Sequence, residues 1–445
     1  MKPNRLHAAR GWIAIGLLAI SLSTTALANG RAPMTNGVFF RPGNNTDIWV
    51  RTTFGLLVSH DDGCTFRWIC EQNVGYGGIF DPTYAVAADG TIYATTYAGL
   101  RVSRDGGCTF TTATESLLEG TPGRIAGRYG EAIDVTATGD VWLGLTDAAM
   151  TNAIYKSTDA GETFQTMGTV PSSIQWKSLR VAPSDPLRIY ATGFEFATDA
   201  TAFFYRSVEG GAMWEAMPTT SFVFGSSPLA RVVGVDPQDA AIVYVATIES
   251  SGPPNPGDRL YRSNDGGATF TEVLVTTNAI TDVLVRGSSV IVVTKVGGFT
   301  STDRGVTFGA VNAALEYGCL AERADGRLFA CGANWGPDFQ AIGQSADGSS
   351  WDKVFRFVEM AGPVECPAGT PQADTCGPMW PVFEEQFGTK GPTCGANVVD
   401  APPEPKPEAS GCCDAAGGAG GTAFLGLLVG ATLHRRRRTK AASCN

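Results

Sequence analysis

The sequence predicts an all-β fold, a single seven-bladed β-propeller, and two observations support this prediction. An eight-residue frame, seen at residues 157–164 as STDAGETF, occurs seven times along the chain. Strand-like segments rich in Val, Ile, Tyr and Phe fill the intervals, and no long helical period interrupts them. A motif that returns about every 40–50 residues is typical of propellers, in which each repeat forms one four-stranded blade.

Five of the seven copies of the frame share a Ser, an Asp two residues later, a Gly two further, then Thr and an aromatic residue. The starts of all seven copies lie 44, 54, 50, 56, 38 and 44 residues apart, so residues 37–358 hold about 46 residues per blade. In chain order the copies are SHDDGCTF (59–66), SRDGGCTF (103–110), STDAGETF (157–164), the degenerate SVEGGAMW (207–214), SNDGGATF (263–270), STDRGVTF (301–308) and the shortened SADGSSW (345–351).

The frame has the composition of a tight turn between two strands. In the copy at 157–164 we expect Asp159 to accept backbone N–H bonds from the following loop. Gly161 can take a positive φ, and Phe164 packs beneath the turn. The same structural role is expected of the equivalent acids Asp61, Asp105, Asp265, Asp303 and Asp347.

This frame resembles the Asp-box, or BNR repeat, of bacterial sialidases, sortilin-type receptor domains, xyloglucan hydrolases and seven-bladed photosystem assembly factors. In those families the box is a structural turn remote from any active site. The resemblance therefore implies a propeller and leaves the ligand and any reaction open.

Each blade reads as strand, tight turn, strand, loop, strand, frame and strand. In blade one the strands are expected at 37–41, 47–51, 55–59 and 65–69. No strand remains to be exchanged between the first and last blades, so the closure of the ring stays open, with 362–394 as one candidate clasp. The inner halves of the later blades read TYAVAADGTIYATT, EAIDVTATGDVWLGLT, SLRVAPSDPLRIYATG, RVVGVDPQDAAIVYVAT, DVLVRGSSVIVVT and GCLAERADGRLFACG.

The N-terminal segment 1–28 has the pattern of a secretory signal peptide. Three basic residues precede a short apolar run, and Ala26-Leu27-Ala28 supplies a small-residue cleavage site. A membrane anchor is the alternative, but the short apolar core and the Ala-x-Ala pattern favour the signal peptide. The propeller is then expected at 37–360 and a Cys-containing extension at 361–400.

The C-terminal segment suggests attachment at the cell surface. A Pro-rich linker (401–411) precedes a tail (412–445) with Cys412-Cys413, an apolar stretch of about 19 residues and an Arg cluster from Arg435 to Arg438. This tail resembles the myxobacterial C-terminal sorting tail. The resemblance implies cleavage near the two Cys and display on the outer surface or release, while a permanent single-pass anchor is the alternative.

The net charge argues against nucleic-acid binding. The whole chain carries a formal charge of -10. Without the signal and tail, 25 basic and 42 acidic residues remain, a net charge near −17. Nucleic acid requires a basic face, so the expected partner is a protein or glycan at the cell surface, bound by a monomer that is attached to the membrane only through its C-terminal segment.

Cysteine usage agrees with export. Eight of the 11 Cys lie outside the tail, an even number for an oxidising compartment. The best pairing is Cys319 with Cys331, which flank an apparent hairpin. Cys366 and Cys376 are close enough in sequence to pair. One arrangement of the others joins Cys70 to Cys108 and Cys64 to Cys394. With only three His in the chain, we expect no metal site, no Ser-His-Asp triad and no cofactor.

Up-and-down strand order predicts which loops share a face. The turn between the first two strands of a blade should lie with the frame, and the loops between strands two and three should lie opposite. That opposite face is the expected ligand site, because binding residues usually lie on loops held by a rigid scaffold. Its candidate ligand-binding residues are Tyr76, Arg128, Tyr129, Glu131, Glu195, Asp199, Glu249, Asp258, Trp335 and Asp338. For any one of them, a solvated loop side chain is the more common role.

A sialidase-like site needs three convergent Arg, a Tyr/Glu pair and an Asp. Phe39-Phe40-Arg41-Pro42 resembles the first arginine motif of sialidases but lacks its Ile, and Arg41 is expected on the frame side. Arg180 and Arg231, on inner strands, could join a cluster, although their convergence is open. Other glycosidases need a carboxylate pair that no motif indicates, and the xyloglucan hydrolases have two propellers where this chain has one.

The sequence therefore favours an exported, non-enzymatic surface propeller that binds a protein or glycan. The alternatives are a sialidase-like glycoside hydrolase acting on extracellular glycans, and a structural component of the surface layer.

Overall fold

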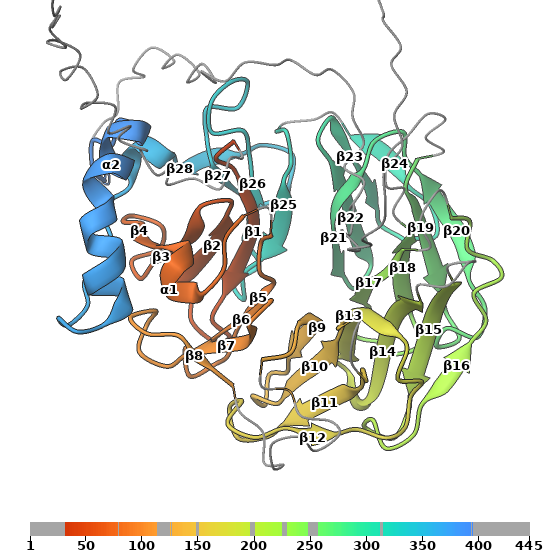
Figure 1. Ribbon diagram of the computed structural model, residues 1–445. Helices are drawn as coiled ribbons and strands as arrows, with labels where there is room; N and C mark the ends of the chain where they lie inside the picture. The colour runs from red at the N-terminus through yellow and green to blue at the C-terminus, as the bar shows by residue number, and fades with distance from the viewer. Residues whose placement is uncertain are drawn as a thin grey trace, which may run out of the picture.

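The seven predicted blades are present, and they form a ring around a central axis (Figure 1). The computed structural model describes residues 32–78, 80–113, 125, 127–147, 151–195, 201–224, 229–247, 257–311, 315–392 and 394. The predicted signal peptide, linker and sorting tail lie outside these residues. Each blade is a four-stranded antiparallel sheet whose strands follow one another in sequence.

The 28 strands are assigned to blades in chain order. Blades one and two contain β1 (Thr35–Phe40), β2 (Ile48–Thr52), β3 (Gly55–Ser59), β4 (Arg67–Ile69), β5 (Tyr84–Val86), β6 (Ile92–Thr96), β7 (Gly99–Ser103) and β8 (Thr111–Thr112). Blades three and four contain β9 (Gly130–Val135), β10 (Val141–Leu145), β11 (Ile154–Ser157), β12 (Gln165–Thr166), β13 (Gln175–Ala182), β14 (Asp185–Glu195), β15 (Thr201–Ser207) and β16 (Glu215–Met217). Blades five to seven contain β17 (Ala230–Val235), β18 (Val243–Thr247), β19 (Arg259–Ser263), β20 (Thr271–Val275), β21 (Ile280–Arg286), β22 (Ser289–Thr294), β23 (Gly297–Ser301), β24 (Gly309–Val311), β25 (Cys319–Glu322), β26 (Leu328–Cys331), β27 (Ile342–Ser345) and β28 (Asp352–Phe355).

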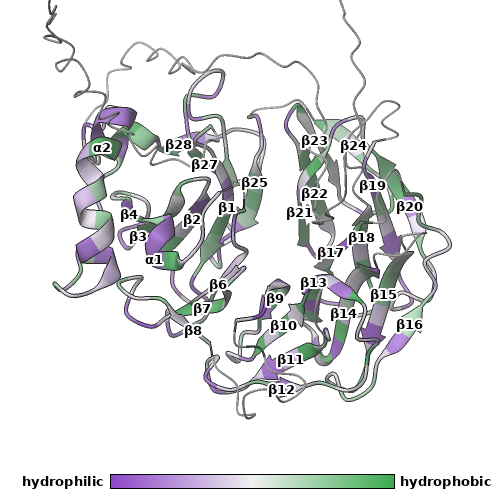
Figure 2. Ribbon diagram, viewed as in Figure 1, coloured by the Kyte–Doolittle hydropathy of each residue, from purple (hydrophilic) through white to green (hydrophobic). Residues whose placement is uncertain are grey.

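The first strand of each blade lines the axis, and neighbouring first strands contact each other around the ring from β1 to β25 and back to β1. The second and third strands are apolar and buried, whereas outer strands such as β12 and β24 are exposed. Figure 2 shows hydrophobic residues in green on many strands of the ring. One buried apolar cluster lies between each pair of neighbouring blades. Burial between blades, more than within them, therefore stabilises the ring.

The register of the strands confirms the predicted division into two faces. Phe40 pairs with Ile48, and Ile48 pairs with Ser59, so the β1–β2 turn and the repeated frame lie at the same end of the blade. Thr35, Thr52 and Gly55 meet at the other end. We call the first end the turn face and the second the funnel face.

The hydrogen bonds predicted for the repeated frame are present. Asp159 Oδ1 accepts from the backbone N–H of Thr163 at 2.9 Å. Ser157, whose role the sequence had left open, adds two more bonds: its hydroxyl donates to Asp159 at 2.7 Å and accepts from the N–H of Gly161 at 2.8 Å. Four other copies share all three bonds. Each turn is thus held by groups within four residues, which explains why the local sequence specifies it.

The Gly of the frame has a second function, which is to allow contact between blades. A Cβ on Gly161 would lie 2.9 Å from the Tyr93 ring of blade two, and a Cβ on Gly267 would lie 2.3 Å from the Phe204 ring of blade four. Both residues also have a positive φ. The frame therefore fixes the turn and, at the same position, the spacing to the preceding blade.

We expect the Asp159→Ala protein to be less stable than the wild type at neutral pH by about 0.5–1 kcal/mol, because the turn loses an acceptor in an exposed setting. Desolvation opposes ionisation of Asp159, but hydrogen bonds from Thr163 and Ser157 outweigh it and lower its pKa to about 2. A lowered folded-state pKa gives stability that is present above the unfolded value and is lost as pH falls through the folded value. The difference in melting temperature between the two proteins should therefore shrink between pH 4 and pH 2.

The control for this experiment is Thr158→Ala, which changes the exposed neighbour of Asp159 in the same turn. Its melting temperature should follow that of the wild type at every pH. A stability gap for Asp159→Ala that stays constant down to pH 2 would contradict the proposed role of the ionised carboxylate.

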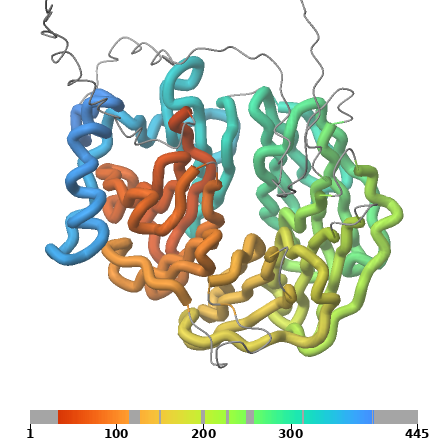
Figure 3. Tube along the Cα trace, viewed as in Figure 1, coloured from red at the N-terminus to blue at the C-terminus, as the bar shows by residue number. Residues whose placement is uncertain are grey.

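The ring closes through the C-terminal extension and without strand exchange, which supports the predicted clasp. After β28 and a short helix, η1 (Phe357–Glu359), the chain crosses to blade one and runs parallel to β4. There Trp68 donates its N–H to the carbonyl of Gly362 at 2.8 Å and accepts from the N–H of Val364 at 2.9 Å. The extension thus adds a short parallel bridge to the outer edge of the first blade, and Figure 3 shows the blue C-terminal extension lying beside the red and orange first blade.

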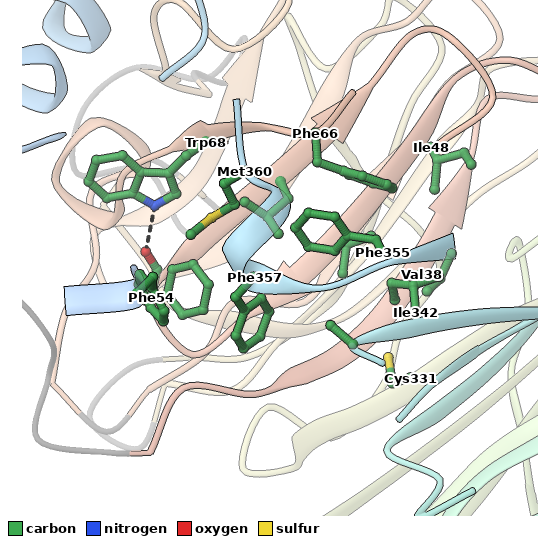
Figure 4. Close-up of a cluster of buried hydrophobic side chains, with 14 of the residues drawn as sticks. Val38, Ile48, Phe54, Phe66, Trp68, Cys331, Ile342, Phe355, Phe357 and Met360 are labelled. Carbon is green, nitrogen blue, oxygen red and sulfur yellow. Dashed lines mark hydrogen bonds between the residues drawn. The ribbon is translucent and has the colours of Figure 1, made fainter. Parts of the chain in front are cut away.

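Helical segments continue the clasp: η2 (Gln372–Cys376) and α2 (Gly377–Phe387) lie beside α1 (Glu71–Val74) and blade one. Phe383 and Phe387 of α2 join Phe54 and Trp68 in the largest apolar cluster. The Trp68 indole N–H donates to the carbonyl of Phe54 at 2.9 Å (Figure 4). This cluster therefore holds the first blade, the last blade and the extension in one core.

Four disulfides join Cys residues in the described part of the chain, and two of the predicted pairs are correct. Cys319–Cys331 and Cys64–Cys394 are confirmed. The predictions of Cys70 with Cys108, and of Cys366 with Cys376, are wrong, because Cys366 and Cys376 of the extension both bond back to the ring. The observed bridges are Cys70–Cys376 and Cys108–Cys366. Three bridges therefore fasten the extension to blades one and two.

No helix in the described part of the chain has the length and hydrophobicity that crossing a lipid bilayer requires.

Candidate functional site

A pocket of about 430 Å³ opens at the centre of the ring. Its walls come mainly from the beginnings of β1, β9, β13, β17 and β21, together with residues 80–83. Inner strands begin at the funnel face, so the pocket lies toward the end of the ring opposite the repeated turns. This volume is in the range of small-molecule sites.

The side chains on the inner strands connect neighbouring blades. Inner strands are not paired to one another by backbone bonds, so each leaves one edge unpaired along the axis. Asp134 accepts from the N–H of Val181 at 2.8 Å, and Asp282 accepts from that of Leu320 at 2.9 Å. Burial raises the pKa of both carboxyls, and for Asp134 the charge of Arg180 opposes the shift. Asp134 and Asp282 therefore link neighbouring inner strands through hydrogen bonds to their backbone N–H groups.

Two guanidinium groups line the pocket without a contact ion pair. Neither Arg51 nor Arg180 has a carboxylate oxygen within 4.0 Å among the described residues. Arg51 is held by Asn36, donating to its side-chain oxygen at 2.7 Å and its carbonyl at 2.6 Å. Burial lowers the pKa of Arg51, and the charge of Asp81 opposes this shift.

Arg180 is the more available of the two. Its Nη1 donates to the carbonyls of Leu179 at 2.9 Å and Ile133 at 3.4 Å. Within the described part of the chain, its Nε and Nη2 have no hydrogen-bond partner. An anion in the pocket can therefore be bound by Arg180 without displacing an existing bond.

The two other basic residues of the pocket, Lys177 and Arg231, form ion pairs with Glu131. Glu131 accepts a bond from Lys177 and lies 3.5 Å from Nη2 of Arg231. The Tyr129 hydroxyl donates to the same carboxylate at 3.4 Å. Burial and the charge of Glu131 raise the pKa of Tyr129, so its hydroxyl stays protonated at neutral pH.

Three aromatic rings form a rim beside the pocket. Tyr97 is 65% exposed, and its ring centroid lies 4.8 Å from that of Tyr129 and 4.4 Å from that of Phe80. Phe80 and Tyr129 also line the pocket. The rim offers an apolar surface for the body of a ligand whose charged group enters the pocket.

Of the predicted ligand-binding residues that the structure describes, only Tyr129 and Glu131 line the pocket. Of the arginines considered for a sialidase-like cluster, Arg180 and Arg231 line it, whereas Arg41 lies on the turn face beside Asp47.

The other described candidates lie elsewhere, and most make structural contacts. Tyr76 packs in the cluster between blades one and two, where burial raises its pKa. Arg128 donates to the carbonyl of Thr151. Trp335 packs against Phe357. Glu195 ends β14 and does not line the pocket.

The remaining acidic candidates divide into two groups. Asp338 accepts from the N–H groups of Glu316 and Ala333, and Asp258 accepts from that of Ile280. Asp199 and Glu249 lie outside the described residues.

Sequence reasoning missed Arg51, Lys177, Phe80 and Asp81. Most of the predicted site residues lie in loops, whereas Arg51 and Lys177 lie on strands. The signal that identifies them is a charged residue inside an otherwise apolar blade strand, as in IWVRT or QWKSLRVA. Such a charge needs a polar environment, and the central channel is one place in the ring that provides it.

Within the described part of the chain, no group of three or more His, Cys, Asp or Glu side chains is arranged to hold a metal ion. The chemistry that the pocket offers comes from its guanidinium, ammonium, carboxylate and phenol groups.

No protein-family model matches the chain, and no curated protein matches it. Similar solved structures include the GH74 enzyme of Niastella koreensis, with 17% identity over 72% of this chain and 65% of that chain and a TM-score of 0.41. The GH74 xyloglucanase of Xanthomonas campestris has 15% identity, coverage of 76% and 61%, and a TM-score of 0.44.

A third similar structure is PorZ, a surface component of the type-IX secretion system of Porphyromonas gingivalis. It has 14% identity, coverage of 71% of this chain and 46% of that chain, and a TM-score of 0.47. The chain spans less than two thirds of the length of each of the three. These likenesses concern the propeller fold alone.

Proposed function

We propose that the protein is an exported, cell-surface binding propeller that holds an anionic group of a protein or glycan in its central pocket. The observation that carries this proposal is the pair of guanidinium groups, Arg51 and Arg180, that line the pocket and have no contact ion pair with any described residue. Lining basic residues outnumber acidic ones by four to three, in a chain with a net charge of -10. A cationic pocket in an acidic protein favours an anionic ligand.

The proposal of export rests on two features. The four disulfides are typical of an oxidising compartment. The predicted signal peptide and sorting tail have the pattern of a protein displayed on the outer surface. Recovery of the protein from the cell surface by protease shaving would test this location, and exclusive recovery from the cytoplasm would contradict it.

Binding of acidic polymers tests the proposed ligand class. We expect saturable binding of polygalacturonate, alginate or a polyglutamate peptide, and no binding of neutral dextran, in titration calorimetry at low salt. Arg180→Gln should weaken the binding of any acidic probe by about 10–100-fold, because a charge-assisted hydrogen bond contributes about 1.5–3 kcal/mol.

The matched control is Arg104→Gln, which removes the same charge from a residue that follows Ser103 on the turn face. Its affinity should equal that of the wild type, and both variants should keep the wild-type melting temperature within a few degrees. Equal binding of dextran and polygalacturonate, or unchanged affinity in Arg180→Gln, would contradict anion capture in the central pocket.

A glycoside hydrolase of sialidase-like type is the second candidate. The observation that favours it is the Tyr129 hydroxyl 3.4 Å from the carboxylate of Glu131, with Arg180 and Arg231 lining the same pocket. A Tyr that passes its proton to a neighbouring carboxylate as it attacks can act as a nucleophile. Turnover of fluorogenic sialosides or glucans that is lost in Glu131→Gln and Arg231→Ala would establish this activity. Absence of turnover on a broad glycan panel, with saturable binding, would leave the binding function.

A further inference from the structure

The carboxylate of Glu131 lines the pocket among its basic groups. It reaches from β9 to Lys177 on β13 and Arg231 on β17, so it lies between cations from two successive blades. Its side chain is 17% exposed and that of Lys177 is 18% exposed, whereas Arg231 is 49% exposed. An internal acid thus satisfies two of the four basic groups that line the pocket.

The other two basic groups are left for a ligand. Arg180 has unbonded Nε and Nη2 groups within the described part of the chain, and Arg51 makes its bonds to neutral oxygens. Asp282 and Asp81 are the remaining lining acids, and each has a partner of its own: the N–H of Leu320 for Asp282 and the side-chain amide of Asn36 for Asp81. With all three acids ionised, the lining carries one net positive charge, which a single carboxylate would neutralise.

We propose, resting on the function above, that Glu131 makes the pocket selective for ligands that present one carboxylate, because Glu131 itself supplies the second. The ligand carboxylate binds Arg180, and the body of the ligand packs toward Tyr129 and Phe80. A second ligand carboxylate finds no free cation, because Lys177 and Arg231 are already paired with Glu131, and the charge of Glu131 repels it. Removing the charge of Glu131 frees both cations and turns the pocket into a site for two carboxylates.

The test uses glucuronate and glucarate, which share a six-carbon skeleton and carry one and two carboxylates. Their dissociation constants are measured by titration calorimetry or ligand-observed NMR on the intact disulfide-bonded protein. Wild type should bind glucuronate at least as tightly as glucarate. Glu131→Gln should shift the ratio of the two constants toward glucarate by about tenfold, because one new charge-assisted contact becomes available.

Two control variants distinguish the effect of where the negative charge lies in the pocket from the effect of the pocket's net charge. Asp81→Asn removes a lining carboxylate that bonds to Asn36 and leaves Lys177 and Arg231 paired. It should raise the affinity for both probes with little change in their ratio. Glu131→Asp keeps the charge and should keep the preference for glucuronate. The melting temperature of each variant shows whether the ring remains folded.

Each outcome has a separate meaning. A wild type that prefers glucarate, or a Glu131→Gln shift no larger than that of Asp81→Asn, would overturn the role of Glu131 while leaving anion capture intact. If neither probe bound the wild type or Glu131→Gln, while acidic polymers bound in an Arg180-dependent way, single-carboxylate selection would likewise be wrong. Absence of Arg180-dependent binding of every anion would remove the proposed function itself.

Discussion

Removing the clasp, by ending the chain after Met360 and replacing Cys64, Cys70 and Cys108 with Ala, will lower the free energy of unfolding by more than about 5 kcal/mol. A single bridge that closes a loop of several hundred residues stabilises by about 5 kcal/mol in the chain-entropy description. The bridge Cys64–Cys394 spans 330 residues. The truncation also uncovers the apolar cluster into which Phe383 and Phe387 pack, and loss of a buried Phe costs about 3–5 kcal/mol.

Urea unfolding followed by Trp fluorescence measures this effect, because the buried Trp68 lies in the cluster that the extension covers. The full-length protein under reducing conditions separates the two contributions, since it loses the bridges and keeps the packing of α2. The control is Cys319→Ala with Cys331→Ala, which removes a bridge of only 12 residues within one blade. A truncated protein as stable as that control would show that the ring closes without the extension.

Replacing Gly267 with Ala will destabilise the ring by about 2–5 kcal/mol. The residue has a φ of +86°, which costs an L side chain about 1–2 kcal/mol. Its new Cβ would also lie 2.3 Å from Cε1 of Phe204, a ring that is 1% exposed and cannot move aside. Overpacking of this kind costs about 1–3 kcal/mol.

The neighbouring Gly266 provides the matched control. Its φ is +71°, so Gly266→Ala carries the same backbone strain. Its new Cβ would meet the ends of the Arg206 and Arg188 side chains and the Tyr190 hydroxyl, and the nearest of these, at 2.9 Å, is the flexible Arg206. Thermal melts should therefore show Gly267→Ala clearly less stable than Gly266→Ala. Equal melting temperatures would mean that the backbone conformation alone explains the Gly, with no role in the spacing of blades.

The blade count and the two faces could be predicted because the information lies within a few residues. Ser263, Asp265, Gly267 and Thr269 bond to one another over four positions, so the same letters recur wherever the same turn forms. The distance between such turns then gives the length of a blade. Pairing within a hairpin, as for Cys319 and Cys331, is predictable for the same reason.

The clasp could only be suspected, because its path depends on contacts across the whole ring. Nothing near Cys376 in sequence indicates that the chain will follow β4 and place this residue beside Cys70. Helix α2 was also hidden, since Pro378 and Pro381 lie within its 11 residues. Its position is determined by Phe383 and Phe387, whose partners lie in blades one and seven.

Some of the pocket residues could be predicted from the sequence, but their arrangement could not. Arg180 and Arg231 could be identified as charges in inner strands, but whether they converge depends on the curvature of a closed ring. Arg51 is on the second strand of its blade and reaches the pocket beside Asn36. The closure of the ring decides which of these side chains come together, and a local sequence pattern cannot indicate this.

The bridge Cys64–Cys394 also determines how the ring carries mechanical load. A pull applied to the chain beyond Cys394 reaches the first blade directly through a covalent bond, and it bypasses β28 and the hydrogen bonds of the last blade. Blade seven is therefore not the weak link, as the terminal sheet of an open chain would be, because the segment from Cys64 to Cys394 is a closed covalent loop. Force on the chain beyond Cys394 therefore acts first on Cys64 of blade one and does not begin by peeling β28 from the last blade.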